Sequence, residues 1–274
     1  MFRLRNELKR RIVPAAAVNE RPLRGELLSS DLLKQHAKNL ARDHKVSDRT
    51  GANFLLSRLA DNENILRDYN AQTLRAEKTR QLTPAAEWLL DNFHLIEEQI
   101  RAARRHLPRR FNRQLPHLTN GALAGFPRVY EIALELISHS DGRVDAPHLT
   151  NFIAAYQEIA DLKLGELWAI PIMLRLALIE NLRRVAVLSG SERLERNRAD
   201  DWADRISAIM ESNPSRLIVV MGEMAQNLPA LSRPFVAEFW RRMQEKSPPI
   251  KLAVSWIEER VAEEGLTVSQ LVQS

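Results

Sequence analysis

The stretch from Leu164 to Ala186 is the feature that most constrains the fold of this chain. Between Leu167 and Ile179 its residues are apolar on nearly every side, and Arg175 is the one charge among them. A helix that is apolar all round must be covered on all sides by other protein or by lipid. A membrane span needs about 18 or more apolar residues with few or no charges, and this run is shorter. The pattern therefore predicts a buried central helix, near 167–186, in a helical domain.

Three details of this stretch are predictions of their own. The helix is expected to end in a polar and basic turn made of Glu180, Asn181, Arg183 and Arg184. Pro171 is expected either to lie in the first turn, where its missing N–H is tolerated, or to kink the helix. The guanidinium of Arg175 either lies at an exposed edge or, if buried, needs a carboxylate partner. Its candidate partners are Glu131, Glu135 and Glu180.

The rest of the chain also has helical periodicity, with no convincing alternating run of strand length. The predicted fold class is all-α, a compact array of roughly ten mostly antiparallel helices. Ser30 is the expected N-cap of the first helix, Thr83-Pro84 opens the third, and Thr267 and Gln270 have the spacing of a capping box. The predicted helices cover 31–42, 53–80, 83–108, 127–138, 147–160, 167–186, 192–211, 215–227, 231–246 and 250–264, with a last turn from Thr267.

The predicted domain organisation is simple. Residues 1–28 contain Pro14, Pro22 and Gly25 and lack a sustained apolar period, so they are expected to form an irregular basic arm. Residues 29–274 are long enough for one helical domain. A weak sub-boundary is expected near 189–191, where Ser189-Gly190-Ser191 interrupts the helical pattern.

Composition limits the chemistry that this chain can carry. It has no cysteine, which excludes disulfides, thiolate metal sites and cysteine catalysis. The basic residues Met1–Arg11 are followed by no long apolar segment, so we expect no signal peptide. Residues 1–113 hold 23 Lys and Arg against 14 Asp and Glu, although the net charge of the whole chain is only +5. This front half could face anionic lipid, nucleic acid or an acidic partner, or it could simply be solvated.

A regular polar stripe lies opposite the apolar face of the predicted helix 83–108. It is acidic first and basic last, which complements the helix dipole. Its members are Glu87, Asp91, His94, Glu98, Arg101 and Arg105. A cluster of arginines overlaps the basic end of this stripe and continues beyond it. Arginine guanidinium groups bind phosphates and carboxylates, so this cluster is a candidate contact surface, with pairing inside the molecule as the alternative. This cluster is Arg101, Arg104, Arg105, Arg109, Arg110 and Arg113. No zinc finger, basic zipper or aromatic RNA-binding strand accompanies it, which disfavours nucleic acid.

Two patterns resemble metal sites of helical enzymes. Asp200, Asp201 and Asp204 form a DDxxD motif that could hold Mg²⁺ for a diphosphate, but no second metal motif is found and arginines nearby can pair with it. Asp91-x-x-His94 resembles half of a carboxylate-bridged site, and no second copy is found. No spacing selects a Ser–His–Asp set or a glycosidase carboxylate pair. The sequence therefore assigns no catalytic, cofactor or metal residue.

The tryptophans allow a carbohydrate-binding interpretation, because their faces stack on sugar rings. Each of them also lies where a helix could bury it, so core packing is favoured. These residues are Trp88, Trp168, Trp202, Trp240 and Trp256.

Four ordered segments carry a resemblance to a known family. They are LTPAAEWLLDNFHLIEEQIR at 82–101, RRHLP at 104–108, GFPRVYEIALELISHSDGRVD at 125–145 and LGELWAIPIMLRLALIENLRRVA at 164–186. Together they resemble the N-terminal region of bacterial cyclic β-1,2-glucan synthases over residues 80–190. That family implies a large inner-membrane enzyme whose cytoplasmic glycosyltransferase domain uses UDP-glucose and whose C-terminal domain is phosphorylase-like. This chain matches none of those catalytic domains, so the family's catalytic residues have no positions here.

The resemblance implies a non-catalytic helical part of such a synthase, on the cytoplasmic side of the inner membrane, with no cofactor of its own. It would contact the glycosyltransferase domain, the β-1,2-glucan or an anionic membrane surface. Two alternatives stay open: an independent magnesium-dependent diphosphate enzyme acting through the DDxxD motif, and a free-standing interaction or lipid-surface module. The candidate interaction residues are Glu87, Trp88, Asp91, His94, Glu98, Arg101, Arg104, Arg105, Glu180, Asn181, Arg183 and Arg184.

Overall fold

The computed structural model of this chain describes residues 20–47, 54–77, 82–107, 114–140, 144–228, 231–244, 251–263 and 265–272. These ranges contain eleven α-helices, one 3₁₀ turn and one pair of two-residue strands, which confirms the predicted all-α class. The chain divides into two units, Met1–Leu188 and Ser189–Ser274. The sequence predicts one helical domain with a weak sub-boundary near 189–191, and the two units divide beside that position, between Leu188 and Ser189.

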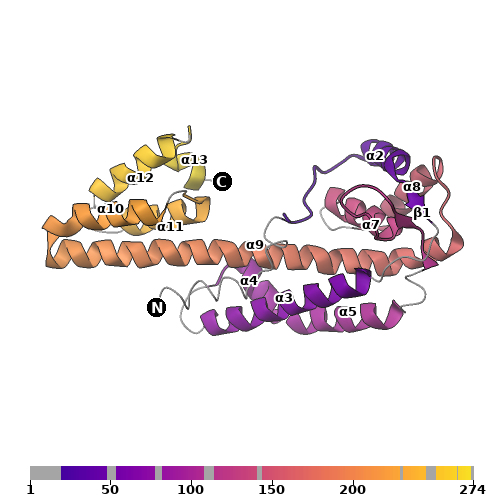
Figure 1. Cartoon of the computed structure of the whole chain (residues 1–274), viewed down its shortest axis with the longest axis horizontal. Helices are drawn as coiled ribbons and strands as arrows, with labels where there is room; N and C mark the ends of the chain where they lie inside the picture. The colour runs from indigo at the N-terminus through magenta and orange to yellow at the C-terminus, as the bar shows by residue number, and fades with distance from the viewer. Residues whose placement is uncertain are drawn as a thin grey trace. The chain divides into compact units, whose positions relative to one another are not determined.

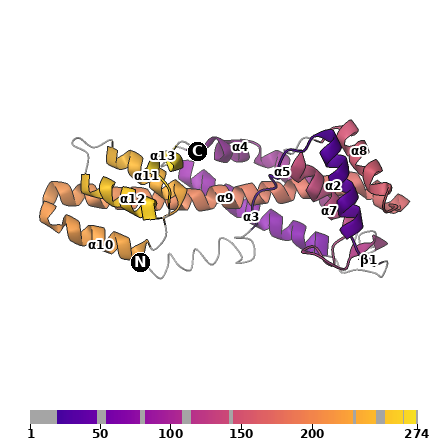
Figure 2. The same cartoon turned by 90° about the horizontal axis from the view of Figure 1, so that it is seen from above.

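The first unit contains the elements from α2 to α8 and the first part of α9 (Figure 1). α3 and α5 run alongside α9, on the same side of it in Figure 1 and flanking it in Figure 2, and α2, α7 and α8 gather near its beginning. One apolar core draws residues from all of these helices, among them Leu33, Leu59, Ile100, Phe152 and Met173. The elements are α2 (Ser30–Asp43), β1 (Val46–Ser47), α3 (Phe54–Glu77), α4 (Pro84–Asp91), α5 (Phe93–His106), β2 (His117–Leu118), α7 (Arg128–His139), α8 (Ala146–Gln157) and α9 (Leu164–Ser212).

Side-chain caps set several helix starts. Thr83 caps α4 as predicted, because its hydroxyl oxygen accepts a hydrogen bond from the Ala86 N–H at 3.3 Å. The cap of α2 is Ser29, one residue before the predicted Ser30, and its hydroxyl oxygen accepts from the Leu32 N–H at 3.5 Å. Helix α8 begins after Asp145, whose carboxylate accepts from a backbone N–H in the first turn at 2.9 Å.

The predicted helix 83–108 is in fact two helices. Asn92, with φ −100° and ψ 10°, separates α4 from α5. Its side-chain amide donates a hydrogen bond to the Trp88 carbonyl at 2.8 Å. Asparagine side chains that bond to nearby backbone groups compete with helix formation. The polar stripe is consequently divided between two helices.

Two short strands and a tight turn were not predicted. β1 and β2 pair antiparallel, with Val46 opposite Leu118 and Ser47 opposite His117. Two residues are too few to give a period-2 signal. After β2 the chain turns at Gly125, where φ is +90° and the Phe54 ring lies 2.6 Å from the position that a Cβ atom would take. Both the backbone angle and the close ring require glycine there.

Helix α9 continues without interruption from Leu164 to Ser212, so its predicted end at 180–184 and the predicted break at 189–191 were wrong. A single glycine in a helix interior costs about 1 kcal/mol and serine less, so Ser189-Gly190-Ser191 disfavours a helix only weakly. Pro171 lies beyond the first turn, inside the helix.

The start of α9 is fixed by a buried ion pair. The Glu166 carboxylate is fully buried and accepts hydrogen bonds from Nε of Arg128 at 2.7 Å and Nη2 of Arg128 at 2.8 Å. It also accepts from the Lys163 N–H at 2.9 Å, in the manner of a helix cap. The Arg128 guanidinium lies 5.9 Å from the centre of the Tyr156 ring. These contacts attach the first turn of α9 to α7 and α8.

The second unit contains the end of α9 and the elements η1 (Pro214–Arg216), α10 (Leu217–Asn227), α11 (Arg233–Gln244), α12 (Lys251–Glu263) and α13 (Val268–Val272). Its separate core includes Met224, Phe235, Phe239 and Ile257. The predicted capping box is confirmed, because the Thr267 N–H donates to Oε1 of Gln270 at 2.9 Å and the Gln270 N–H donates to Oγ1 of Thr267 at 3.3 Å. Among all described helices, none is both long enough and apolar enough to cross a membrane.

Two glycines of the second unit test these backbone assignments. Gly222 lies inside α10 with nothing within 4 Å of the position that a Cβ atom would take, so Gly222→Ala should stabilise the protein by about 0.5–1 kcal/mol. Gly265 has φ +74°, so Gly265→Ala should destabilise it by about 1 kcal/mol. Urea denaturation followed by circular dichroism measures both, and shifts of the same sign would contradict the assignments.

Candidate functional site

One side of the first part of α9 is open in the described chain. Its residues follow one another in alternating steps of four and three: Leu164, Trp168, Pro171, Arg175, Leu178 and Leu182. Trp168 is 72% exposed, Leu164 63% and Leu178 40%. The other side is fully covered, with Ala169 and Met173 at 0%. The predicted burial of this helix therefore holds for one face only.

From Pro171 to Leu182 the open stripe forms one wall of a groove of about 800 Å³, whereas Leu164 and Trp168 do not line it. α4, α5 and the beginning of α8 supply the other walls. The lining is mostly hydrocarbon: Trp88, Leu95, Ile96, Val144, Ala146, Leu149, Pro171, Leu174, Leu178, Ile179 and Leu182. The polar lining residues are Asn92, Gln99, Asp145, Arg175 and Asn181. A sizeable apolar depression that water would otherwise fill is typical of a binding site.

Arg175 is half-buried in the wall of this groove. Its three predicted partners are engaged elsewhere: Glu131 with His44, Glu135 with His36 and Glu180 with Arg58. No carboxylate of the described ranges pairs with Arg175, so the alternative of an exposed edge is the correct one. The guanidinium is therefore available to a group that enters the groove.

Two of the five tryptophans are not core residues. Trp88 is 53% exposed and lines the groove, and Trp168 lies on the open stripe. The core interpretation was wrong for these two. Trp202, Trp240 and Trp256 do pack, half-buried, against the core of the second unit.

The polar stripe of α4 and α5 is exposed along its length, at Glu87, Asp91, His94, Glu98, Arg101 and Arg105. Arg104 forms an ion pair with Glu63 of α3, so part of the basic cluster is neutralised within the molecule. Arg109, Arg110 and Arg113 lie outside the described residues. Asp91 ends α4 and His94 belongs to α5, and they join no metal-compatible group among the described residues.

The four residues predicted to form a terminal turn lie instead in the middle of α9. Glu180 and Arg183 are each 1% exposed, and the Glu180 carboxylate accepts hydrogen bonds from Arg58, Asn62, Arg183 and Arg184. The distances run from 2.7 to 2.9 Å. Glu20 also pairs with Arg58 and Arg183. The set joins α9, α3 and the segment before α2.

This cluster holds residues 20–28, the described part of the predicted arm, against α9. Oδ1 of Asn181 accepts a hydrogen bond from the Leu23 N–H at 2.7 Å, and Arg184 donates to the Arg21 carbonyl at 3.2 Å. Burial disfavours the charged form of Glu180, but the hydrogen bonds and charges of Arg58 and Arg183 outweigh it and hold its pKa well below the usual range. Glu180 and Arg183 therefore stabilise the interior, whereas Asn181 both holds the arm and lines the groove.

Aspartates of the DDxxD motif form ion pairs with an arginine of another helix. Arg242 of α11 forms ion pairs with Asp204 and, at 3.7 Å, with Asp200. Asp200, Asp201 and Asp204 form no metal-compatible group among the described residues. The arrangement offers no support for a magnesium-dependent diphosphate enzyme.

A group that the sequence did not single out does have metal-binding geometry. His36, Glu135 and His139 bring three ligand atoms within 4.8 Å of one another. The spacing Glu135-x-x-x-His139, which places both side chains on one helix face, was the available signal. The third residue, His36, is 99 residues away from Glu135, so no local pattern could add it.

Removing the buried charge of Glu180 tests the interior cluster. Glu180→Gln should lower the free energy of unfolding by about 3–5 kcal/mol, because it leaves buried arginines without their carboxylate. The pKa of Glu180 is depressed in the folded state, so its contribution is present above about pH 4.5, its usual value, and is lost as the pH falls further. The difference in the free energy of unfolding between the wild type and Glu180→Gln, measured by urea titration, should therefore shrink as the pH is lowered below about 4.5.

The matched control is Glu98→Gln on the exposed stripe, which should change stability by no more than about 0.5 kcal/mol. Equal effects of the two substitutions would show that Glu180 does not have the role assigned to it.

Comparison with known proteins adds a relative. No family model matches this chain. It is 38% identical over 206 residues to the cyclic β-(1,2)-glucan synthase NdvB of Rhizobium meliloti (strain 1021). The matched region is 75% of this chain and 7% of that protein, so the chain spans only a small part of its relative's length. This confirms the resemblance found in the sequence: the chain is related to the cyclic β-1,2-glucan synthase family and corresponds to one part of such a protein.

Proposed function

We propose that this chain is a non-catalytic, helical N-terminal part of a cyclic β-1,2-glucan synthase, and that the groove beside α9 receives another segment of that synthase. The observation that carries the first half is the 38% identity over 75% of the chain to a protein named as such a synthase. Activity with UDP-glucose would belong to a glycosyltransferase domain elsewhere in the synthase. The chain would then lie on the cytoplasmic side of the inner membrane, close to that domain.

The open stripe of α9 supports the second half of the proposal. Steps of three and four residues place Pro171, Leu178 and Leu182 along one line in the wall of the groove, which is the spacing that a second helix packs against. An amphipathic helix that enters an apolar groove typically buries such residues together. Arg175, in the middle of the stripe, would pair with an acidic residue of the incoming helix.

The chemistry of the lining favours a protein segment over the other two partners expected from the sequence. A glucan carries many hydroxyl groups, and the few polar side chains of the groove could satisfy only some of them. A membrane surface is flat and attracts basic side chains, whereas this groove is concave and contains one acid, Asp145, and one base, Arg175. Trp88 remains the best candidate for a contact with sugar.

The exposed stripe on α4 and α5 is a second candidate contact. Arg101 and Arg105 have no acidic partner within the described part of the chain, in contrast to Arg104. We propose that these two arginines face an acidic surface of the synthase.

A chimera tests the function directly. This chain replaces the matching segment of the Rhizobium meliloti synthase, and cyclic glucan made from labelled UDP-glucose is measured in membranes. The chimera should be active. Leu178→Arg should then lower synthesis about tenfold or more, because a charge buried at a contact without a partner costs about 1.4 kcal/mol or more.

The matched control is Leu188→Arg, also on α9 and 44% exposed but outside the groove, which should leave synthesis nearly unchanged. An inactive chimera that accumulates normally in the membrane would contradict the assignment to the synthase. Equal activity of the two variants would contradict docking in the groove. Quenching of tryptophan fluorescence in the purified chain by β-1,2-glucan, abolished by Trp88→Ala, would identify glucan as the occupant instead.

A further inference from the structure

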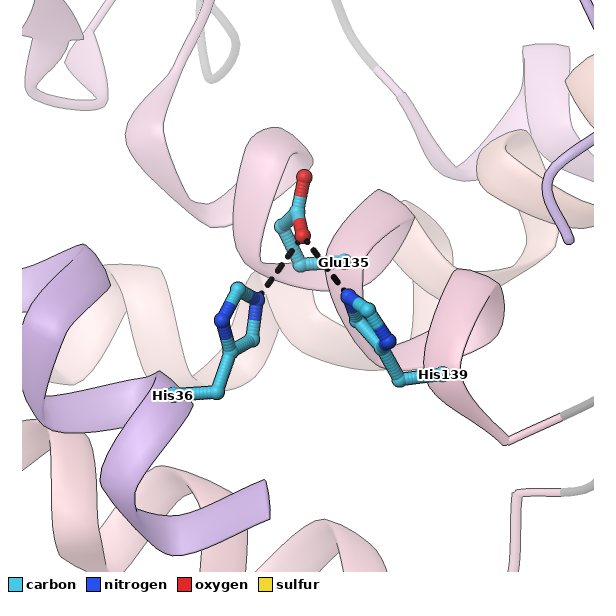
Figure 3. Close-up of side chains that lie close together, drawn as sticks. All are labelled: His36, Glu135 and His139. Carbon is cyan, nitrogen blue, oxygen red and sulfur yellow. Dashed lines mark hydrogen bonds and ion pairs between the residues drawn. The ribbon is translucent and has the colours of Figure 1, made fainter. Parts of the chain in front are cut away.

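Three side chains from two helices converge beside the arm that precedes α2. His36 belongs to α2, whereas Glu135 and His139 lie one turn apart on α7, and both imidazole rings point at the same carboxylate (Figure 3). Nε2 of His36 lies 2.9 Å from Oε2 of Glu135, and Nε2 of His139 lies 3.5 Å from the same oxygen. The two rings meet edge to face, with centroids 4.6 Å apart.

The far side of the His139 ring is held by the backbone. Its Nδ1 lies 2.8 Å from the Glu26 carbonyl oxygen, a contact in which the nitrogen must donate a proton. In the neutral ring Nε2 then has no proton, and its lone pair points toward the carboxylate of Glu135. Two acceptors that face each other at 3.5 Å repel unless a proton or a cation lies between them. A metal-bound histidine commonly has this arrangement, with its second nitrogen donating to a carbonyl group.

The arm is built to make that contact. The Gly25 N–H donates to the Ser138 carbonyl at 2.9 Å and to Oγ of Ser138 at 3.0 Å. A Cβ atom on Gly25 would lie 2.7 Å from the His139 ring, so only glycine lets the chain pass this closely. The arm, α2 and α7 therefore meet at the three side chains.

The spacing of the ligand atoms fits a metal ion. An ion with ligands at about 2.0–2.1 Å separates tetrahedral neighbours by roughly 3.3 Å. The distances from Oε2 of Glu135 to the two Nε2 atoms, 2.9 and 3.5 Å, are close to this value, and all three ligand atoms lie within 4.8 Å of one another. The side chains are 30%, 32% and 17% exposed, so an ion and a water molecule can reach them.

We propose that His36, Glu135 and His139 bind a divalent transition-metal ion, with Zn²⁺ as the ion that best suits the ligands, and that this ion fastens α2 and the arm to α7. Two imidazole nitrogens and one carboxylate are a common zinc set, in which water completes the tetrahedron. The same nitrogens are poor ligands for Mg²⁺ and Ca²⁺, which prefer oxygen. This inference does not depend on the function proposed above.

The test uses the full chain without a histidine tag, freed of metal by a chelator and then mixed with ZnCl₂ or CoCl₂. One zinc ion per chain should remain after gel filtration, measured by elemental analysis. Zinc should also raise the melting temperature, and Co²⁺ should give a visible absorption spectrum. Glu135→Gln and His36→Ala should each weaken binding at least about tenfold and abolish the shift.

The matched control is His148→Ala, which removes another exposed histidine that pairs with a carboxylate, Asp145, and should bind zinc as the wild type does. Glu135→Gln keeps the size of the side chain, so it remains informative if His36→Ala fails to fold. The proposal is overturned if the wild-type chain retains no stoichiometric zinc, or if Glu135→Gln binds zinc as tightly as the wild type and His148→Ala.

Discussion

The first unit depends on one buried carboxylate. Glu180 lies in the middle of α9 and is satisfied by donors from α3 and from its own helix. Desolvation of a charge costs several kcal/mol, so this position tolerates an ionised group only while those donors stay in place. Two of these donors, Arg58 and Arg183, also pair with Glu20 at the beginning of the described arm. Burial of the ionised Glu180 therefore requires α3, α9 and the arm to be in place together. An apolar core alone would not impose this alignment.

That requirement explains why α9 can have two very different faces. The covered face places small residues such as Ala169 and Ala177 against the core, where helices approach closely. The open face presents Pro171, Arg175 and Leu178 to the groove, and Trp168 lies exposed on the same face. Since the polar cluster and the Arg128–Glu166 pair hold the helix from the covered side, nothing on the open face is needed to keep it there. Its apolar residues are available to a partner.

Local patterns predicted much of the fold. Thr83 and the pair Thr267 and Gln270 predict helix starts, because their side chains form hydrogen bonds with backbone N–H groups three residues away. The features that the sequence did not predict are of two kinds. Some depend on contacts between residues far apart in the sequence, and others depend on whether a segment continues a helix or ends it when both have similar local energies. Ser189 and Gly190 are compatible with both a helix interior and a helix end. The periodicity of Leu164–Ala186 identified a helix, but an apolar side chain has the same sequence pattern whether it faces a core or a groove. His36 and Glu135 meet only because α2 packs against α7 and α8.

The attachment of α2 shows why a cluster at its surface matters. Its buried residues are Leu33, Ala37 and Ala41, and two of these bury only a methyl group each. At roughly 25 cal/mol per Å² such a small apolar stripe contributes little. Polar links therefore carry an unusual share of the attachment: His36 to Glu135, Lys38 to Glu158 at 2.6 Å, and His44 to the Tyr156 hydroxyl at 2.8 Å. Partly exposed ion pairs contribute at most about 1 kcal/mol each. A metal ion in place of the link between His36 and Glu135 would strengthen this attachment, and it would do so at the point where the arm also meets α7.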